Sequence, residues 1–193
     1  MGRFDNRTKD QFKKDIYFGT MLEKYFMEKI AEHDCISNVR DNGVGNDGGF
    51  IESGVNTSGA DYMVDIEWND EEGHGGTFNL PLEVKWVPTY GKFTLKVNDL
   101  KAYIREKAAI LFIYTNKYLP LKKPRDHDLK AHIKLIEHHS EHLRWGIMFP
   151  DTVKSFLECK QDEIKKIPYM GNKLGIVLPQ SEFGNWIKEE KFL

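Results

Sequence analysis

The stretch GADYMVDIEW (59–68), followed by the turn NDEEGHGGTFN (69–79) and by LPLEVKW (80–86), decides the fold. Every second residue from 62 to 68 is large and apolar, and this period of two is typical of a half-buried strand. In the second part, Leu82, Val84 and Trp86 share one face. Glu83 and Lys85 share the other face. We therefore predict two neighbouring strands, the second of which presents a carboxylate and an ammonium group side by side.

Charged residues on an otherwise apolar strand need a partner, because burying an unpaired charge is costly. Asp61 opens the preceding strand and is a candidate partner. Two carboxylates from adjacent strands form a hard-oxygen site suited to Mg²⁺, which keeps several waters and accepts phosphate oxygens. The carbonyl of Val84 is a further candidate ligand. Lys85 would orient the attacking water or stabilise the charge that grows on the phosphate.

A helix over residues 10–32 is predicted by apolar side chains at spacings of three and four. Glu23 lies in the middle of the apolar arc, one turn after Gly19. A carboxylate on a core face needs a cation, a metal or donors, so Glu23 is a candidate to hold a second metal or its waters. The alternative is a glutamate that reaches the solvent or pairs with a lysine. The apolar arc consists of Phe12, Ile16, Gly19, Phe26, Met27 and Ile30.

The middle of the chain predicts a strand–helix–strand unit, and hence a parallel pair of strands. Asn98 is expected to cap a helix that runs to about Lys107. The continuous apolar run 108–115 is typical of a strand buried on both sides. Further strands are expected at 144–150 and 173–179, with a helix at 151–166. The expected inward residues of the middle helix are Val97, Leu100, Tyr103 and Ile104.

Residues 33–60 are rich in Gly, Asn, Asp and Ser and predict loops, with a short strand at 48–53. The segment GVGNDGG lacks the Lys-Ser/Thr ending of a phosphate-binding loop. The predicted helix 128–143 carries His132, His138, His139 and His142. Their spacing, and the absence of a nearby cysteine, favour a solvated helix face over a zinc site.

Composition is that of an ordinary folded protein: 193 residues, 40% hydrophobic and 30% charged. No apolar run approaches the roughly 20 residues of a membrane helix, and the N-terminus lacks the apolar core of a signal peptide. Only Cys35 and Cys159 are present, so we expect a reducing, cytoplasmic location. The net charge of −2 neither predicts nor excludes binding to nucleic acid.

The arrangement resembles the PD-(D/E)XK nuclease superfamily. Asp61, which precedes an apolar strand, and the triplet Glu83-Val84-Lys85 match its central motif, and Gly19-x-x-x-Glu23 looks like the first-helix glutamate of several of its branches. Ala60 stands where the superfamily often has proline. Asp65 is a rival to Asp61, but roughly 13 Å of strand separates the two, so both cannot bind one metal; the resemblance favours Asp61.

The resemblance implies an α/β fold with a restriction-endonuclease-like core, in which helices flank a central mixed sheet. Residues 1–193 would form a single nuclease domain, with a core at about 10–115 and a C-terminal extension at about 120–193. The implied activity is Mg²⁺-dependent hydrolysis of DNA, with Mn²⁺ as a substitute, by Glu23, Asp61, Glu83 and Lys85. The implied enzyme is of the restriction or homing type. The alternatives are a structure-specific nuclease such as a Holliday junction resolvase, a non-catalytic DNA-binding module, and a nuclease that acts on RNA.

Contacts with the DNA backbone are expected from Lys92, Lys96, Lys101 and Arg105, although such residues are equally suited to solvent. The loop Lys122–Arg125 is a further candidate, and loop 41–58 is a candidate to enter a groove. A homodimer would bring two sites to the two strands of a duplex.

Overall fold

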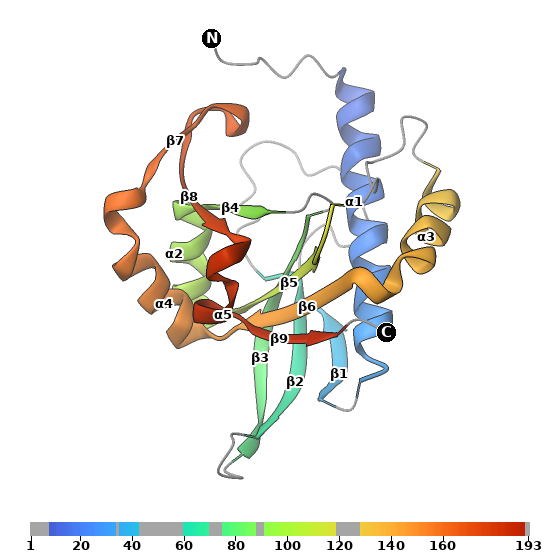
Figure 1. Ribbon diagram of the computed structural model, residues 1–193, viewed down its shortest axis with the longest axis horizontal. Coiled ribbons are helices and arrows are strands. Elements are labelled where there is room, and N and C mark those ends of the chain that lie inside the picture. The colour runs from blue at the N-terminus through green and yellow to red at the C-terminus, as the bar shows by residue number, and fades with distance from the viewer. Residues whose placement is uncertain are drawn as a thin grey trace.

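The computed structural model of the chain describes residues 8–33, 35–42, 60–69, 75–87, 91–118 and 128–191. Within these ranges the protein has an α/β fold, in which helices pack on both faces of a mixed sheet (Figure 1). The predicted fold class is confirmed at this level. The strands are β1 (Ile36–Asp41), β2 (Tyr62–Asn69), β3 (Gly75–Trp86), β4 (Lys92–Lys96), β5 (Ala109–Thr115), β6 (Leu143–Met148), β7 (Lys165–Ile167), β8 (Lys173–Pro179) and β9 (Lys188–Lys191). The helices are α1 (Lys9–Ile30), α2 (Val97–Glu106), α3 (Leu129–His138), α4 (Pro150–Cys159) and α5 (Phe183–Trp186).

Strand β3 lies in the middle of the main sheet, whose strands follow the order β1-β2-β3-β5-β6. It pairs antiparallel with β2 and parallel with β5, while β1 with β2 and β5 with β6 are antiparallel pairs. The short strand β9 extends the sheet by pairing with β6. Because α2 lies between β3 and β5 in the chain, the predicted parallel pair is confirmed. The last third of the chain thus contributes strands to the same sheet as β2 and β3.

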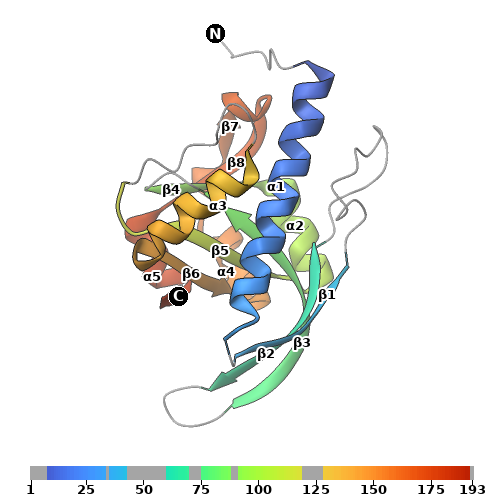
Figure 2. The same ribbon diagram turned by 90° about the vertical axis from the view of Figure 1, so that its right-hand side faces the viewer.

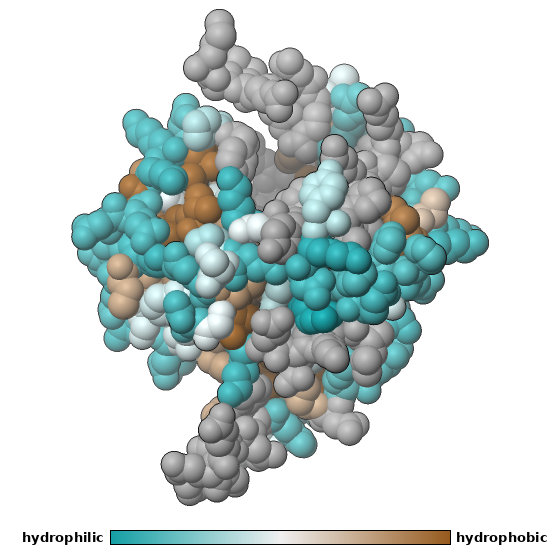
Figure 3. Space-filling model, in the orientation of Figure 1, coloured by the Kyte–Doolittle hydropathy of each residue, from teal (hydrophilic) through white to brown (hydrophobic). Residues whose placement is uncertain are grey.

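A second, antiparallel sheet of order β4-β8-β7 packs beside the main one. Its buried side chains, including Phe93, Leu95, Ile176 and Leu178, share a core with α2, α4 and β5. Leu174 of β8 is 51% exposed, and hydrophobic surface shows over this sheet (Figure 3). None of the helices within the described ranges is both long and apolar enough to cross a membrane.

The two faces of β3 and β5 point into separate hydrophobic cores. Helices α1 and α3 cover one face, where Leu82 and Val84 are buried (Figure 2). Helices α2 and α4 and the second sheet cover the other face, where Tyr103 is buried. All seven residues of β5 are buried, as predicted for a strand covered on both sides. Because side chains alternate along a strand, Glu83 and Lys85 point toward α2.

Local capping fixes the ends of the two helices that flank the site. Thr8 caps α1, because its side chain accepts a hydrogen bond from the Gln11 amide at 3.2 Å while its own amide donates to the Gln11 side chain at 2.9 Å. The N-cap of α2 is Lys96, so the predicted cap at Asn98 is wrong by two residues. Helix α2 ends at Glu106, and its C-cap, Lys107, turns the chain out of the helix with a φ of 53°.

The core face of α1 is confirmed at its C-terminal end and wrong at its N-terminal end. Phe26 and Ile30 are fully buried, but Phe12 is 38% exposed. Phe18 and Leu22, which lay outside the predicted arc, are buried at 5% and 2% exposure. The physical reason is that the first turns of α1 extend beyond the sheet, so the sheet does not cover them (Figure 2).

Strand β1 lies where only loop was predicted, so the interpretation of residues 33–60 is wrong for residues 36–41. The sequence of β1 shows no alternation of apolar residues, because Ile36 is its one buried residue. The strand forms through antiparallel pairing with β2. The predicted strand at 48–53 and nearly all of loop 41–58 lie outside the described residues. The helix predicted at 151–166 ends at Cys159.

We expect Phe26→Ala to lower the free energy of unfolding by about 3–5 kcal/mol, because it removes a fully buried ring that packs on Trp86 at 4.8 Å. Phe12→Ala is the matched control, since it removes the same ring from a partly exposed position of the same helix. Urea denaturation measures both. Equal losses in the two variants would contradict the core described for α1.

Candidate active site

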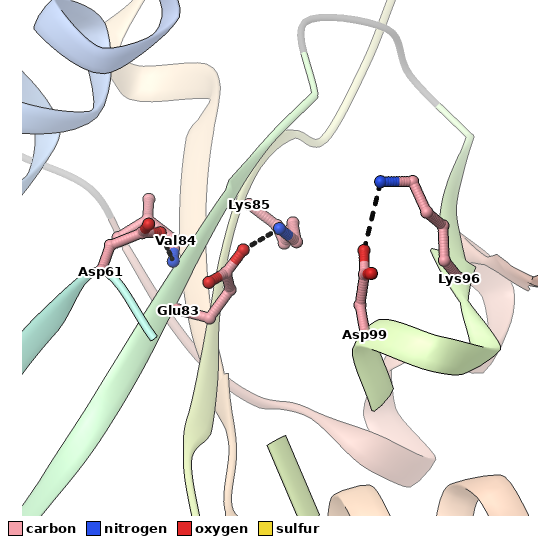
Figure 4. Close-up of polar contacts among 6 residues, drawn as sticks. All are labelled: Asp61, Glu83, Val84, Lys85, Lys96 and Asp99. Carbon is pink, nitrogen blue, oxygen red and sulfur yellow. Dashed lines mark hydrogen bonds and ion pairs between the residues drawn. The ribbon is translucent and has the colours of Figure 1, made fainter. Parts of the chain in front are cut away.

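The pairing of β2 with β3 brings Asp61 beside Glu83. Tyr62 lies opposite Leu82 in the antiparallel register, so the preceding residue, Asp61, falls next to Glu83. The amide of Val84 donates a hydrogen bond to Asp61 Oδ2 at 3.3 Å (Figure 4). In the sequence 22 residues separate the two carboxylates, and the hairpin closes that distance.

The Glu83 and Lys85 side chains form an ion pair on the α2 side of β3 (Figure 4). The Glu83 side chain is only 8% exposed, whereas the Lys85 side chain is 31% exposed. Burial lowers the pKa of Lys85, but the negative charge of Glu83 and further interactions with Tyr103 and Asp61 outweigh it and hold that pKa well above its usual value. The pair therefore places a cation at the rim of the site and a carboxylate at its floor.

Glu23 lies on α1, where it is half-buried, close enough to Asp61, Lys85 and Glu83 for their charges to act on it. Burial, and then the negative charge of Asp61, raises the pKa of Glu23 to about 8, while Lys85 acts in the opposite direction. Burial, and then the charge of Glu83, raises the pKa of Asp61 to about 7. Thus the structure places Asp61, Glu83 and Lys85 together, with Glu23 within electrostatic range of them, and the three carboxylates outnumber the single ammonium.

Tyr103 is a member of the site that the sequence did not reveal. It was predicted as an inward residue of α2, and it is indeed buried, at 3% exposure. Its hydroxyl lies close to the Glu83 carboxylate, and the centroid of its ring lies 5.8 Å from Lys85 Nζ. Helical periodicity cannot separate a core tyrosine from one that serves a site. The usable signal was that a buried phenol needs a hydrogen-bond partner and that Glu83 faces the same helix.

The rival carboxylate, Asp65, is placed elsewhere on the same sheet face. Its side chain accepts hydrogen bonds from Asn38 at 2.6 Å and from Asn79 at 2.5 Å. The Asn79 bond, and then the Asn38 bond, lowers the pKa of Asp65. Asp65 lies opposite Asn79 in the register, four residues before Glu83 on β3.

The donor set suits a hard divalent cation. Asp61 and Glu83 supply two carboxylates, and the Val84 carbonyl points to the same edge of β3 as the Val84 amide, which is the edge where Asp61 lies. Within the described ranges, no three His, Cys, Asp or Glu residues gather closely enough to hold a metal by themselves. A bound Mg²⁺ would therefore keep waters, as this ion usually does.

The four residues predicted to contact DNA lie on β4 and α2, on the side of the site away from α1. Lys92 and Lys101 are exposed. Lys96 pairs with Asp99 at 3.2 Å (Figure 4), and Arg105, 65% exposed, pairs with Glu106 at 2.9 Å. The loop Lys122–Arg125 lies outside the described residues.

The histidines of α3 and the turn after it do not form a common site with the carboxylates. His132 is buried, and burial lowers its pKa. Its ring packs on Phe18 at 5.3 Å, which ties α3 to α1.

Comparison of the chain with protein-family models, with curated proteins and with solved structures finds no match. The function is therefore inferred from the residues of the site.

We expect the stability of the metal-free protein to fall as the pH rises from about 5 to 8.5. Glu23 and Asp61 hold protons in the folded state to a higher pH than in the unfolded state. The contribution of these protons to the free energy of unfolding is fully present below the pKa values of the unfolded state, near 4. It is lost as the pH rises through the pKa values of the folded state.

Glu23→Gln replaces a carboxyl group that must ionise in the folded protein with a neutral amide. It should therefore raise the free energy of unfolding at pH 8.5 by roughly 1–2 kcal/mol, after allowance for solvent screening. Urea denaturation in the presence of a chelator measures it. Glu67→Gln, at an exposed position, is the matched control and should change nothing. A stability of the wild type that rises with pH over this range would contradict the described site.

Proposed function

We propose that this protein is a metal-dependent nuclease that hydrolyses phosphodiester bonds in DNA, built on a restriction-endonuclease-like core. The observation that carries the proposal is the cluster of Asp61, Glu83 and Lys85 at the junction of β2 and β3, with Glu23 supplied by α1. The order of helix, antiparallel strands, crossover helix and buried parallel strand supports the same core.

The residues of the site have separate tasks in such a reaction. Asp61, Glu83 and the Val84 carbonyl would hold Mg²⁺ or Mn²⁺. The bound ion would polarise the scissile phosphate and lower the pKa of a water. Lys85, which is partly exposed beside Glu83, would orient the attacking water or stabilise the negative charge that grows on the phosphate. Glu23 would bind further waters or a second ion.

We expect Lys85→Ala and Asp61→Asn each to reduce DNA cleavage by about 100-fold or more, because each removes a charge that acts on the transition state. The assay offers supercoiled plasmid and a four-way junction with Mg²⁺ or Mn²⁺. Lys134→Ala, an exposed lysine of α3, is the control and should cleave like the wild type.

The preferred substrate in this assay distinguishes the kinds of nuclease. Discrete plasmid fragments support a restriction or homing type, and cleavage of branched DNA alone supports a junction resolvase. Equal activity in the wild type, Lys85→Ala and Asp61→Asn would place the chemistry elsewhere. A wild type that binds DNA without cutting it would favour a non-catalytic module, and cleavage of RNA alone would change the substrate class.

The exposed cations of β4 and α2 support binding to the DNA backbone, although their ion pairs also suit a solvated surface. We expect Lys101→Ala to weaken DNA binding about equally for different sequences and to reduce the salt dependence by about one released counterion. Fluorescence anisotropy over a salt series, with Asp61→Asn as the background, measures this. If the slope of the binding constant against salt concentration, on logarithmic scales, is the same in this variant, Lys101 of α2 does not contact the DNA backbone. The homodimer suggested for cleavage of both strands stays a prediction.

A further inference from the structure

Tyr103 lies where α2 covers the buried side of the candidate active site. The first turns of α2 are anchored by Val97 and Leu100, which are buried at 4% and 0% exposure in the same core as Tyr103. The tyrosine ring is therefore held by a packed helix rather than by a loop. A residue on such an element can fix the geometry of the groups it touches.

Two contacts connect Tyr103 to the charged pair on β3. Its hydroxyl lies close to the Glu83 carboxylate, the most buried of the site's acidic groups, and can donate a hydrogen bond to it. Its ring centroid lies 5.8 Å from Lys85 Nζ, which is within the range of a cation–π contact. One side chain thus touches both the proposed metal ligand and the proposed catalytic cation.

We propose that Tyr103 is a positioning residue that holds the Glu83 carboxylate and the Lys85 ammonium in the arrangement that the reaction requires. This inference rests on the proposed nuclease function for its catalytic consequence, but the contacts with Glu83 and Lys85 stand without it. The residue itself takes no part in bond making or bond breaking.

The physical argument begins with the Glu83 carboxylate, which has two oxygens and several acceptor positions. Lys85 pairs with one oxygen, and Asp61 lies beside the same carboxylate through the pairing of β2 with β3. The Tyr103 hydroxyl adds a donor from α2, so a rotation of the carboxylate away from Lys85 and Tyr103 would cost it these partners. A metal that binds between Asp61 and Glu83 then meets a carboxylate already oriented toward it.

The ring of Tyr103 has a second effect, on Lys85. A lysine side chain has a flexible four-carbon stem and a compact charge, so an ion pair alone restrains it weakly. A metal held by Glu83 would weaken the attraction of Glu83 for the Lys85 ammonium. The face of the Tyr103 ring would still attract that ammonium and restrain the side chain.

The hydroxyl and the ring can be removed separately. Tyr103→Phe keeps the ring and loses the hydroxyl, and Tyr103→Leu loses both. We expect Tyr103→Phe to weaken the binding of Mn²⁺, measured by titration calorimetry without DNA, by about 10-fold or more, as is usual when the hydrogen-bond partner of a metal ligand is lost. It should also lower kcat about 10-fold while KM for DNA stays unchanged. Tyr103→Leu should lower kcat further without a further loss of Mn²⁺ affinity.

Tyr114→Phe is the matched control, because Tyr114 is equally buried in the same core and belongs to β5. It should leave Mn²⁺ affinity and kcat unchanged. All variants are compared below the onset of thermal unfolding, which circular dichroism establishes. Equal Mn²⁺ affinity and kcat in Tyr103→Phe and the wild type would overturn the proposal, as would a wild type that binds no Mn²⁺.

Failure of the nuclease function gives a different result. If the wild type cuts no DNA or RNA but Tyr103→Phe still weakens Mn²⁺ binding, Tyr103 positions a metal ligand and the proposed reaction is wrong. If Tyr103→Phe lowers kcat as much as Tyr103→Leu does and both lose the same Mn²⁺ affinity, the hydroxyl alone positions the site, and the role given to the ring is wrong.

Discussion

The burial of the Glu83 carboxylate is the constraint on which the rest of this structure depends. A carboxylate at 6% exposure in the middle of a sheet is stable only when counter-ions and donors surround it. Lys85 supplies the counter-ion from the same strand, and Tyr103 supplies a donor from α2. Each partner comes from a position that the fold must hold fixed, so the polar cluster and the hydrophobic cores constrain one another.

Strand β3 can hold this cluster in place because it is hydrogen-bonded to a neighbouring strand along each of its edges. Antiparallel pairing with β2 sets the register that places Asp61 beside Glu83, and parallel pairing with β5 requires the crossover through α2 that delivers Tyr103. A slip of one residue between β2 and β3 would exchange the faces of every side chain. It would turn Glu83 into the apolar core beneath α1, so the apolar residues of β3 protect the site by fixing its register.

Much of this framework could be predicted from the sequence, because its signals are strong and local. Period-two alternation marked β2, a continuous apolar run marked β5, and the two charges on an apolar strand marked the site. The failures occur where order comes from distant parts of the chain. Strand β1 buries only Ile36 and forms through pairing with β2, Phe12 lies beyond the end of the sheet, and the contact of Tyr103 with Glu83 exists only after α2 has packed.

The charge balance of the cluster links its stability to its proposed chemistry. Three carboxylates and one ammonium leave an excess of negative charge that burial makes unfavourable, and the raised pKa values of Glu23 and Asp61 express this cost. Protons relieve the excess in the metal-free protein, and Lys85 is then the one positive charge of the cluster that could attract a phosphate. A hard divalent cation relieves it better, because it neutralises two charges through oxygen ligands and keeps coordination positions for water and phosphate oxygens. The same unfavourable charge that an ordinary core would avoid is therefore what would suit this position to the proposed hydrolysis of phosphodiesters.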